Sequence, residues 1–141
     1  MALKDAVKRL LDQRGVAYTD FGTHTAESVD YPDFAARVAT EVAAGRFDRG
    51  ILICGSGVGM AMAANRFPGV RAAAASDVTL ARLAREHNNA NVLALGERTT
   101  PPEMARRVVD VFLDTPFAGG RHERRVAKID AVSQASAKPG P

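Results

Sequence analysis

The sequence contains one cysteine, Cys54, no tryptophan, and few aromatic residues, which make up 6% of its 141 residues. A single cysteine excludes an intramolecular disulfide bond, so a reducing, cytoplasmic environment is expected. Neither a signal peptide nor an apolar run long enough to cross a membrane is visible. The formal net charge is only +3, and the arginines are dispersed along the chain. These absences argue against partners such as membranes and nucleic acids.

The residues that are present are typical of one globular domain. Hydrophobic residues make up 46% and charged residues 25% of the chain, as in ordinary soluble proteins. A chain of this length can bury roughly 68% of its unfolded surface in a single core. We therefore expect one domain over residues 1–132, in which residues 119–132 form a C-terminal helical arm. Residues 133–141 are polar, contain proline and glycine, and are expected to be disordered.

Helical and strand-like hydrophobic spacings alternate along the chain. Strands are expected at residues 16–21, 51–54, 70–75 and 91–95, with helices before, between and after them. This alternation predicts a doubly wound, Rossmann-like three-layer α/β fold with a mostly parallel sheet. Ligands bind such sheets beyond the carboxyl ends of the strands. Cys54, Asp77 and the loop before Tyr31, which carries His24 and Glu27, are expected there.

The stretch 51–59, Ile-Leu-Ile-Cys-Gly-Ser-Gly-Val-Gly, is the most informative part of the sequence. A short buried strand brings Cys54 into a glycine-rich turn, and the turn opens a helix near Met60. Backbone N–H groups at a helix N-terminus can bind an anion and activate a thiol. The turn is therefore a candidate catalytic site. A lone cysteine at the end of a buried strand also serves often as a small apolar residue.

A dinucleotide-binding fingerprint is an alternative interpretation of the same glycines. Gly55 and Gly57 fit that pattern, and Asp77 follows the next strand, where a ribose-binding acid would lie. The third glycine, however, would fall at Met60. No Gly-Lys-Ser/Thr follows the turn, so the sequence has no Walker A motif.

Four stretches resemble type B ribose-5-phosphate isomerases, a family that also contains galactose-6-phosphate and allose-6-phosphate isomerases. They are residues 20–33, 50–60, 84–96 and 119–125, and the resemblance extends from about residue 3 to residue 129. It implies aldose–ketose isomerisation of a sugar phosphate through a cis-enediolate, with no metal or organic cofactor. Ribose 5-phosphate and ribulose 5-phosphate are the expected pair.

The resemblance also implies roles for the residues of the glycine-rich turn and for the end of a later helix. Cys54 matches the catalytic base that moves a proton between C1 and C2 of the open-chain sugar. Ser56 matches a residue that moves protons between hydroxyl groups, and His87 matches the residue that opens the furanose ring. The enediolate oxygen would be bound by the backbone N–H groups of the turn, Gly55, Gly57, Val58 and Gly59.

Further residues match the family's contacts with sugar and phosphate. Tyr31 and Asn88 match pocket residues, and Arg121 and Arg125 match phosphate contacts. Arg98 is expected to add another ligand contact. Arginines four residues apart share one helix face and can grip a phosphate. Each residue also has a structural alternative. His87 could cap a helix, Tyr31 could pack its ring at a helix entry, and the arginines could form a solvated face.

The resemblance implies a homodimer, or a dimer of dimers, in which the C-terminal helix reaches across subunits. An apolar stripe on that helix would be buried there, formed by Val126, Ile129 and Val132. Members of the family begin with a strand that ends in an Asp-His-Ala-Gly-type turn and supplies one sugar and one phosphate contact. Its absence here would leave unpaired backbone groups and an apolar groove. Either the true start lies about a dozen residues upstream, which we favour, or the chain is a shortened paralogue with impaired binding.

These observations leave three candidate functions. The first is an isomerase of ribose 5-phosphate, and the second is an isomerase of a six-carbon aldose 6-phosphate, such as allose or galactose 6-phosphate. The third is a non-catalytic sugar-phosphate-binding or nucleotide-binding module, which the missing Asp-His turn favours.

Overall fold

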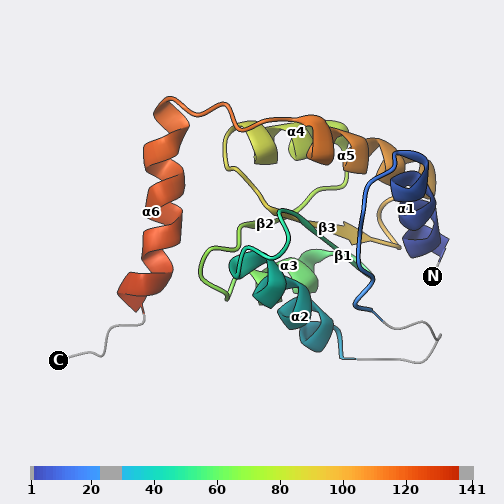
Figure 1. The fold of residues 1–141 in the computed structure, drawn as a ribbon, viewed down its shortest axis with the longest axis horizontal. Coiled ribbons are helices and arrows are strands. Elements are labelled where there is room, and N and C mark those ends of the chain that lie inside the picture. Colours follow the sequence, from blue (N-terminus) through green and yellow to red (C-terminus); the bar gives the residue numbers. More distant parts are fainter. Residues whose placement is uncertain (1, 23–29, 137–141) are drawn as a thin grey trace.

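The computed structural model describes residues 2–22 and 30–136 of the chain (Figure 1). The helices are α1 (Ala2–Gln13), α2 (Tyr31–Ala43), α3 (Val58–Ala64), α4 (Val78–Glu86), α5 (Pro102–Asp114) and α6 (Arg121–Ser136). The strands are β1 (Gly50–Cys54), β2 (Ala72–Ala74) and β3 (Val92–Gly96). His24 and Glu27, expected at the mouth of the site, lie outside the described residues. No helix in the described part of the chain has the length and hydrophobicity needed to cross a membrane.

The three strands form one parallel sheet in the order β1-β3-β2. Gly50 and Ala72 both pair with Val92, and Cys54 pairs with Gly96, so the carboxyl ends of the strands lie at one edge. The central strand β3 is buried at all five positions. A strand covered on both faces needs a continuous apolar run, which the sequence Val-Leu-Ala-Leu-Gly supplies.

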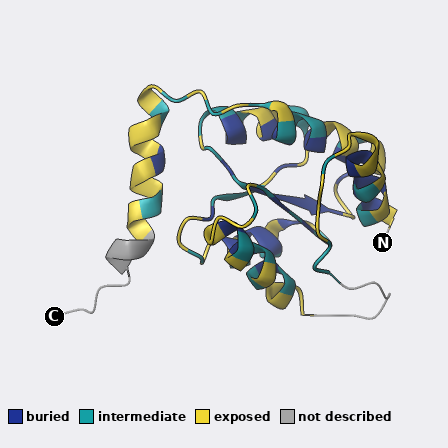
Figure 2. Ribbon diagram, in the orientation of Figure 1, coloured by how far each residue is buried: buried dark blue, intermediate teal, exposed yellow. Residues whose placement is uncertain are grey.

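Helices cover both faces of the sheet, which gives the three layers in Figure 1. On one face, α1, α4 and α5 pack a core around Leu93, Leu95 and Phe112. On the other face, α2 and α3 pack a second core around Leu52 and Val92. Figure 2 shows the strands and the inward sides of these helices as buried. The predicted Rossmann-like α/β class is therefore confirmed.

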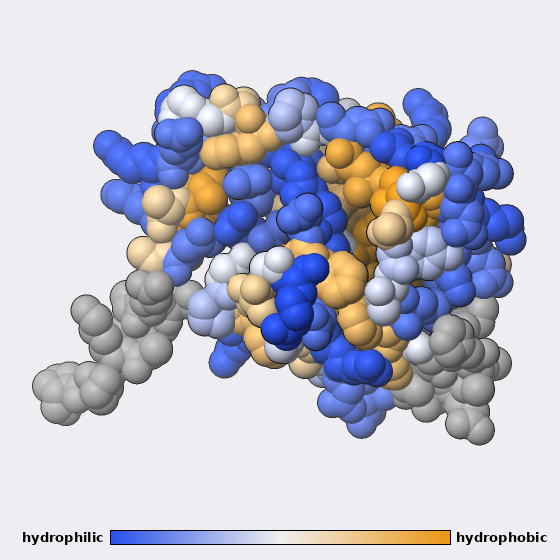
Figure 3. Space-filling model, viewed as in Figure 1, coloured by the Kyte–Doolittle hydropathy of each residue, from blue (hydrophilic) through white to orange (hydrophobic). Residues whose placement is uncertain are grey.

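The expected strand at residues 16–21 is not formed: these residues are neither helical nor paired in a sheet within the described chain. Val16 packs against the core, so the apolar pattern of this segment correctly indicated burial. A strand also needs a neighbour for its backbone groups. Here an apolar groove of about 660 Å³ separates residues 16–22 from β1. Figure 3 shows hydrophobic side chains around this hollow.

The C-terminal helix α6 lies beside the domain and is exposed along most of its length (Figures 1 and 2). It continues to Ser136, past residue 133, at which the sequence analysis placed the start of a disordered tail. Along the predicted apolar stripe, Val126 is buried against the domain, whereas 48% of Ile129 and 62% of Val132 are exposed.

Candidate functional site

Cys54 is the last residue of β1, and the chain turns directly after it into α3. The thiol is half-buried, and its Sγ accepts a hydrogen bond from the Gly57 N–H at 3.2 Å. A charged acceptor such as a thiolate forms a stronger hydrogen bond with a backbone N–H than a neutral acceptor does. The turn therefore places a nucleophilic atom and a donor side by side at the carboxyl edge of the sheet.

The shape of this turn depends on Gly57. Its φ of +84° is left-handed, a conformation that side chains with a Cβ adopt at a cost. A Cβ at Gly57 would also lie 3.1 Å from the Leu95 carbonyl carbon and 3.2 Å from the Ala94 carbonyl. The turn therefore packs directly on the backbone of β3, which holds Cys54 and the start of α3 in one fixed arrangement.

Backbone N–H donors without a partner among the described residues remain at the start of α3. The Val58 N–H donates to the Ser56 hydroxyl oxygen at 3.3 Å, whereas the N–H groups of Gly59 and Met60 have no hydrogen-bond partner within the described residues. The first N–H groups of a helix cannot bond within the helix and are free for caps or ligands. These two donors can therefore bind a substrate oxygen beside Cys54.

Tyr31 and Arg98 both lie close to this turn. A Cβ at Gly59 would be 2.7 Å from atoms of the Tyr31 ring, so the ring covers the first turn of α3 closely. Arg98 donates its backbone N–H to the Gly55 carbonyl at 2.9 Å, and a Cβ at Gly55 would be 3.7 Å from the Arg98 Nε. Both side chains are exposed. We call the residues from Cys54 to Gly59, with Tyr31 and Arg98, the carboxyl-edge group.

The other predicted site residues gather at the end of α4. His87 is the C-cap of that helix, and its ring stacks on that of His122 with centroids 4.3 Å apart and planes inclined by 14°. His122 lies in the first turn of α6, between Arg121 and Arg125, both of which are exposed. We call His87, Asn88, His122 and these two arginines the amino-edge group.

Electrostatics favour a neutral His122. Burial lowers the pKa of its imidazole, and the positive charges of His87, Arg121 and Arg125 lower it further, against a small opposing effect of Glu86. A cluster of positive groups with a histidine kept neutral is suited to binding an anion, because an anion would relieve the repulsion. Sequence reasoning missed His122, although it stands beside Arg121 in the stretch 119–125.

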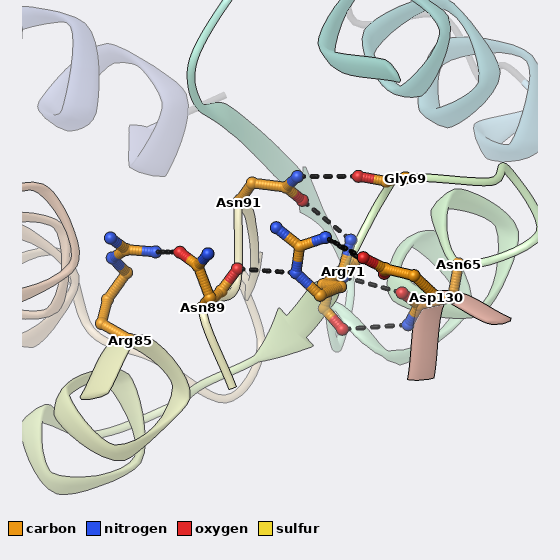
Figure 4. A network of polar contacts seen from close by, with 8 residues as sticks. Asn65, Gly69, Arg71, Arg85, Asn89, Asn91 and Asp130 are labelled. Atoms are coloured by element: carbon orange, nitrogen blue, oxygen red, sulfur yellow. Dashed lines mark hydrogen bonds and ion pairs between the residues drawn. The ribbon is translucent and has the colours of Figure 1, made fainter. Parts of the chain in front are cut away.

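A polar network fixes α6 to this edge of the sheet (Figure 4). The Arg71 guanidinium forms an ion pair with Asp130 of α6 at 3.1 Å and donates to the Asn89 carbonyl at 2.9 Å. The Asn91 side chain bridges the Arg71 N–H and the Gly69 carbonyl. Together with the histidine stack, these contacts hold the first and middle turns of α6 at defined positions.

The two groups lie at opposite edges of the sheet within one chain. Helix α4 returns from the carboxyl end of β2 to the amino end of β3, so His87 precedes Val92 and lies far from Cys54. A five-residue strand is roughly 16 Å long. The structure therefore does not bring Cys54 together with His87, Asn88, Arg121 or Arg125 in a single chain.

Asp77 has a structural role. Its carboxylate accepts a hydrogen bond from the Leu80 N–H at 2.8 Å and caps α4. This occupation of Asp77 removes the ribose-binding acid that a dinucleotide fingerprint would need. Within the described residues, no cluster of three or more His, Cys, Asp or Glu side chains could hold a metal ion.

Known proteins share the sequence and the fold of this chain. The chain matches the family model for Ribose/Galactose Isomerase over residues 1–129. It is similar to ribose-5-phosphate isomerase B of Escherichia coli, with 47% identity over 132 residues that cover 94% of this chain and 89% of the relative. D-erythrulose-4-phosphate isomerase of Pectobacterium atrosepticum is 41% identical over 128 residues, which cover 90% of this chain and 84% of that protein.

A solved structure shares the fold closely. Ribose-5-phosphate isomerase B of Clostridium thermocellum has a TM-score of 0.94 and 48% identity, covering 96% of this chain and 92% of that one. Sequence and fold thus agree over nearly the whole chain, as the motifs in the sequence indicated. This chain belongs to the Ribose/Galactose Isomerase family and is an aldose–ketose isomerase.

Proposed function

We propose that this chain interconverts ribose 5-phosphate and ribulose 5-phosphate, with Cys54 as the base. The observation that carries the proposal is the geometry of the turn, in which the Cys54 thiol and the free N–H groups of Gly59 and Met60 share one side of the sheet edge. The relatives named ribose-5-phosphate isomerase B support the choice of substrate. The reaction would take place in the cytoplasm and without a cofactor.

The chemistry follows from the positions of these groups. The Cys54 thiolate takes the proton from C2 of the open-chain aldose, and the electron pair moves to give a cis-enediolate whose negative oxygen the turn N–H groups bind. The thiol then returns the proton to C1, which yields the ketose. Ser56 moves the hydroxyl proton between O2 and O1. Donors that are already in place need no rearrangement when charge develops on the substrate.

The amino-edge group supplies the remaining roles from a second subunit. His87 opens the furanose ring, with Asn88 beside it, and Arg121 and Arg125 bind the phosphate. Because these residues lie at the edge opposite Cys54 in one chain, we propose a homodimer in which two copies join the two groups. The exposed side chains of Ile129 and Val132 on α6 would be covered by the partner.

The first experiment measures ribulose 5-phosphate formation from ribose 5-phosphate by the purified chain. Replacing Cys54 by Ala should lower kcat by about 10²-fold or more, the usual contribution of a positioned base. Met62→Ala is the matched control, because Met62 lies on α3 but is 67% exposed and has no role in the reaction. Unchanged turnover in Cys54→Ala would overturn the mechanism.

Subunit complementation tests the shared site. Cys54→Ala and His87→Ala chains should each have little activity alone, but mixed dimers have one intact site if Cys54 and His87 come from different subunits. Random mixing should then restore about a quarter of the wild-type activity, because half of the dimers are mixed and each has one good site of two. No recovery would place both residues in the same subunit.

The alternative substrates are separated by the same assay. The family model is described as Ribose/Galactose Isomerase, so a six-carbon aldose 6-phosphate is the second candidate. Higher catalytic efficiency on allose 6-phosphate or galactose 6-phosphate than on ribose 5-phosphate would identify a six-carbon sugar phosphate as the substrate. Calorimetric binding of ribose 5-phosphate without conversion would instead indicate a non-catalytic binding protein.

A further inference from the structure

Arg71, the residue before β2, is held at the amino edge of the sheet by its backbone. Its carbonyl accepts the N–H groups of Asn91 and Val92 at 2.9 and 3.2 Å, and its own N–H donates to the Asn91 side-chain oxygen at 2.8 Å. The Asn91 side chain also donates to the Gly69 carbonyl at 2.9 Å. The Arg71 side chain therefore extends from a fixed point (Figure 4).

The Arg71 guanidinium joins two segments that meet at this edge. Its Nε donates to the Asn89 carbonyl at 2.9 Å, and its Nη1 donates to both carboxylate oxygens of Asp130 on α6, each at 3.1 Å. Only 16% of the Arg71 side chain is exposed, so solvent and salt screen this ion pair less than one at the surface. A planar guanidinium presents its donors in a fixed fork. Arg71 therefore holds the loop after α4 and helix α6 at one separation.

The loop after α4 is itself fixed where Arg71 contacts it. Asn89 has a φ of +47°, which is uncommon for a residue other than glycine. Its side-chain oxygen accepts from the buried Arg85 at 2.9 Å, and its N–H donates to the Arg85 carbonyl at 3.2 Å. Asn89 directly follows His87 and Asn88 in the sequence. The contacts of Asn89 therefore also set the position of these two predicted site residues.

Helix α6 is attached to the domain at its first turn and again further along. The first attachment is the stack of His122 on His87, and the later one is the ion pair of Asp130 with Arg71. The two lie roughly two turns apart, about 11 Å along the helix axis. Attachments at this spacing fix the direction of α6 as well as its position. The two arginines proposed to bind phosphate lie beside the first attachment and between the two.

We propose that Arg71 is a positioning residue that determines which length of sugar phosphate the site accepts. It fixes the span from His87, which acts at the C1 end when the ring opens, to the arginines of α6, which bind the phosphate. The phosphate of an aldose 6-phosphate lies one carbon further from C1 than that of an aldose 5-phosphate, so one fixed span fits one of them better. The inference rests on the proposed function, which assigns these roles to His87, Arg121 and Arg125.

The test compares the substrate preference of the wild type with that of Arg71→Met, which keeps an unbranched side chain but removes the guanidinium donors. The wild type should distinguish ribose 5-phosphate from allose 6-phosphate in kcat/KM, because one carbon in a fitted pocket changes this value by roughly 10- to 200-fold. In Arg71→Met the ratio of the two kcat/KM values should move toward unity by about tenfold or more. A residue needed only for folding would lower both values alike and leave their ratio unchanged.

A second variant breaks the same link from the side of α6. Asp130 lies outside the sheet and its side chain is 39% exposed, so Asp130→Ala should fold and should shift the ratio in the same direction as Arg71→Met. Arg14→Met and Asp110→Ala are the matched controls. They remove an ion pair of 2.7 Å that joins the end of α1 to α5 and includes no residue of the carboxyl-edge or amino-edge group. Both controls should leave the ratio unchanged.

Calorimetry separates this inference from the proposed function. In a Cys54→Ala background it gives the Kd of each sugar phosphate without turnover, so the preference can be compared among all variants. A wild type that converts neither sugar would refute the proposed function, whereas the ratio of the two Kd values would still decide the role of Arg71. An unchanged ratio in both Arg71→Met and Asp130→Ala would overturn that role. A wild type that does not distinguish the two sugars would do the same.

Discussion

His87 and His122 stack with ring centroids 4.3 Å apart and join the end of α4 to the first turn of α6. The neighbouring Ala118 N–H donates to the Glu86 carbonyl at 3.1 Å, so backbone and side chains attach the arm at the same point. This junction gathers Arg121 and Arg125 around the two rings.

We predict that the pKa of His122 lies below its ordinary value of 6.5, since burial and then the charge of His87 lower it. A pKa lowered in the folded state stabilises the fold above pH 6.5, and this contribution is lost as the pH falls through the pKa of folded His122. NMR titration of the imidazole measures it directly. His87→Phe keeps a ring in the stack but removes a charge, so the pKa of His122 should rise. A midpoint at or above 6.5 in the wild type would contradict the prediction.

Gly57→Ala should destabilise the fold more than Gly69→Ala. Both glycines have a φ near +85°, so each alanine incurs the left-handed conformational cost of roughly 1–2 kcal/mol. At Gly57 the new Cβ also meets the backbone of Leu95 and Ala94, whereas at Gly69 nothing lies within 4 Å. Urea denaturation gives the two free energies of unfolding. Equal losses would show that the turn does not pack tightly on β3.

Arg85→Met should cost about 3 kcal/mol of stability, because it leaves buried carbonyl groups without a donor. Arg85 is only 3% exposed, and its guanidinium donates to the carbonyls of Thr115 and Ala90 and to the Asn89 side chain. Burial, followed by the charges of Arg49 and Arg71, lowers the pKa of Arg85 to about 10.

Arg82→Met provides the control for this prediction. Arg82 lies on the same helix but is exposed, and among the described residues it pairs only with Glu86, a contact that contributes about 0.5 kcal/mol or less. Thermal or urea unfolding of both variants compares the two positions. Similar small losses would mean that the carbonyls around Arg85 find other partners.

Ionisation of Asp20 should make the stability of the fold depend on pH in the acidic range. Burial opposes its ionisation, but hydrogen bonds from Lys4, the Gly22 N–H and Lys8 outweigh this and lower its pKa from 3.8 to about 2. A lowered pKa stabilises the folded state above pH 3.8, and the contribution, about 2 kcal/mol, is lost as the pH falls from about 4 to 2. Asp20→Asn should therefore be less stable at pH 7 and equal to the wild type near pH 2.

Asp48→Asn is the matched control for Asp20, because Asp48 is an exposed groove residue that forms no ion pair within the described chain. Its unfolding free energy should follow that of the wild type between pH 7 and 2. A constant difference between Asp20→Asn and wild type across this range would show that the Lys4 and Lys8 contacts do not depend on ionised Asp20.

Features with local causes could be read from the sequence by itself. The apolar run that ends at Cys54, followed by glycines, determined the turn between β1 and α3, because a left-handed residue and a close backbone contact both need glycine at position 57. Asp77 was recognisable as a helix cap because its partner, Leu80, is three residues away. Alternating periodicities likewise determined the α/β class.

Only the tertiary structure decided the features that depend on distant parts of the chain. Residues 16–21 have a strand-like pattern but do not pair, because pairing depends on whether another strand lies beside them. The stacking of His122 on His87 and the separation of both from Cys54 follow from the direction of α4 across the sheet. Hydrogen bonding along a helix or turn acts over a few residues, whereas strand pairing and helix packing join residues far apart in sequence. Local patterns therefore identified the glycine-rich turn at Cys54, and only the packed chain showed that the other predicted site residues lie at the other edge.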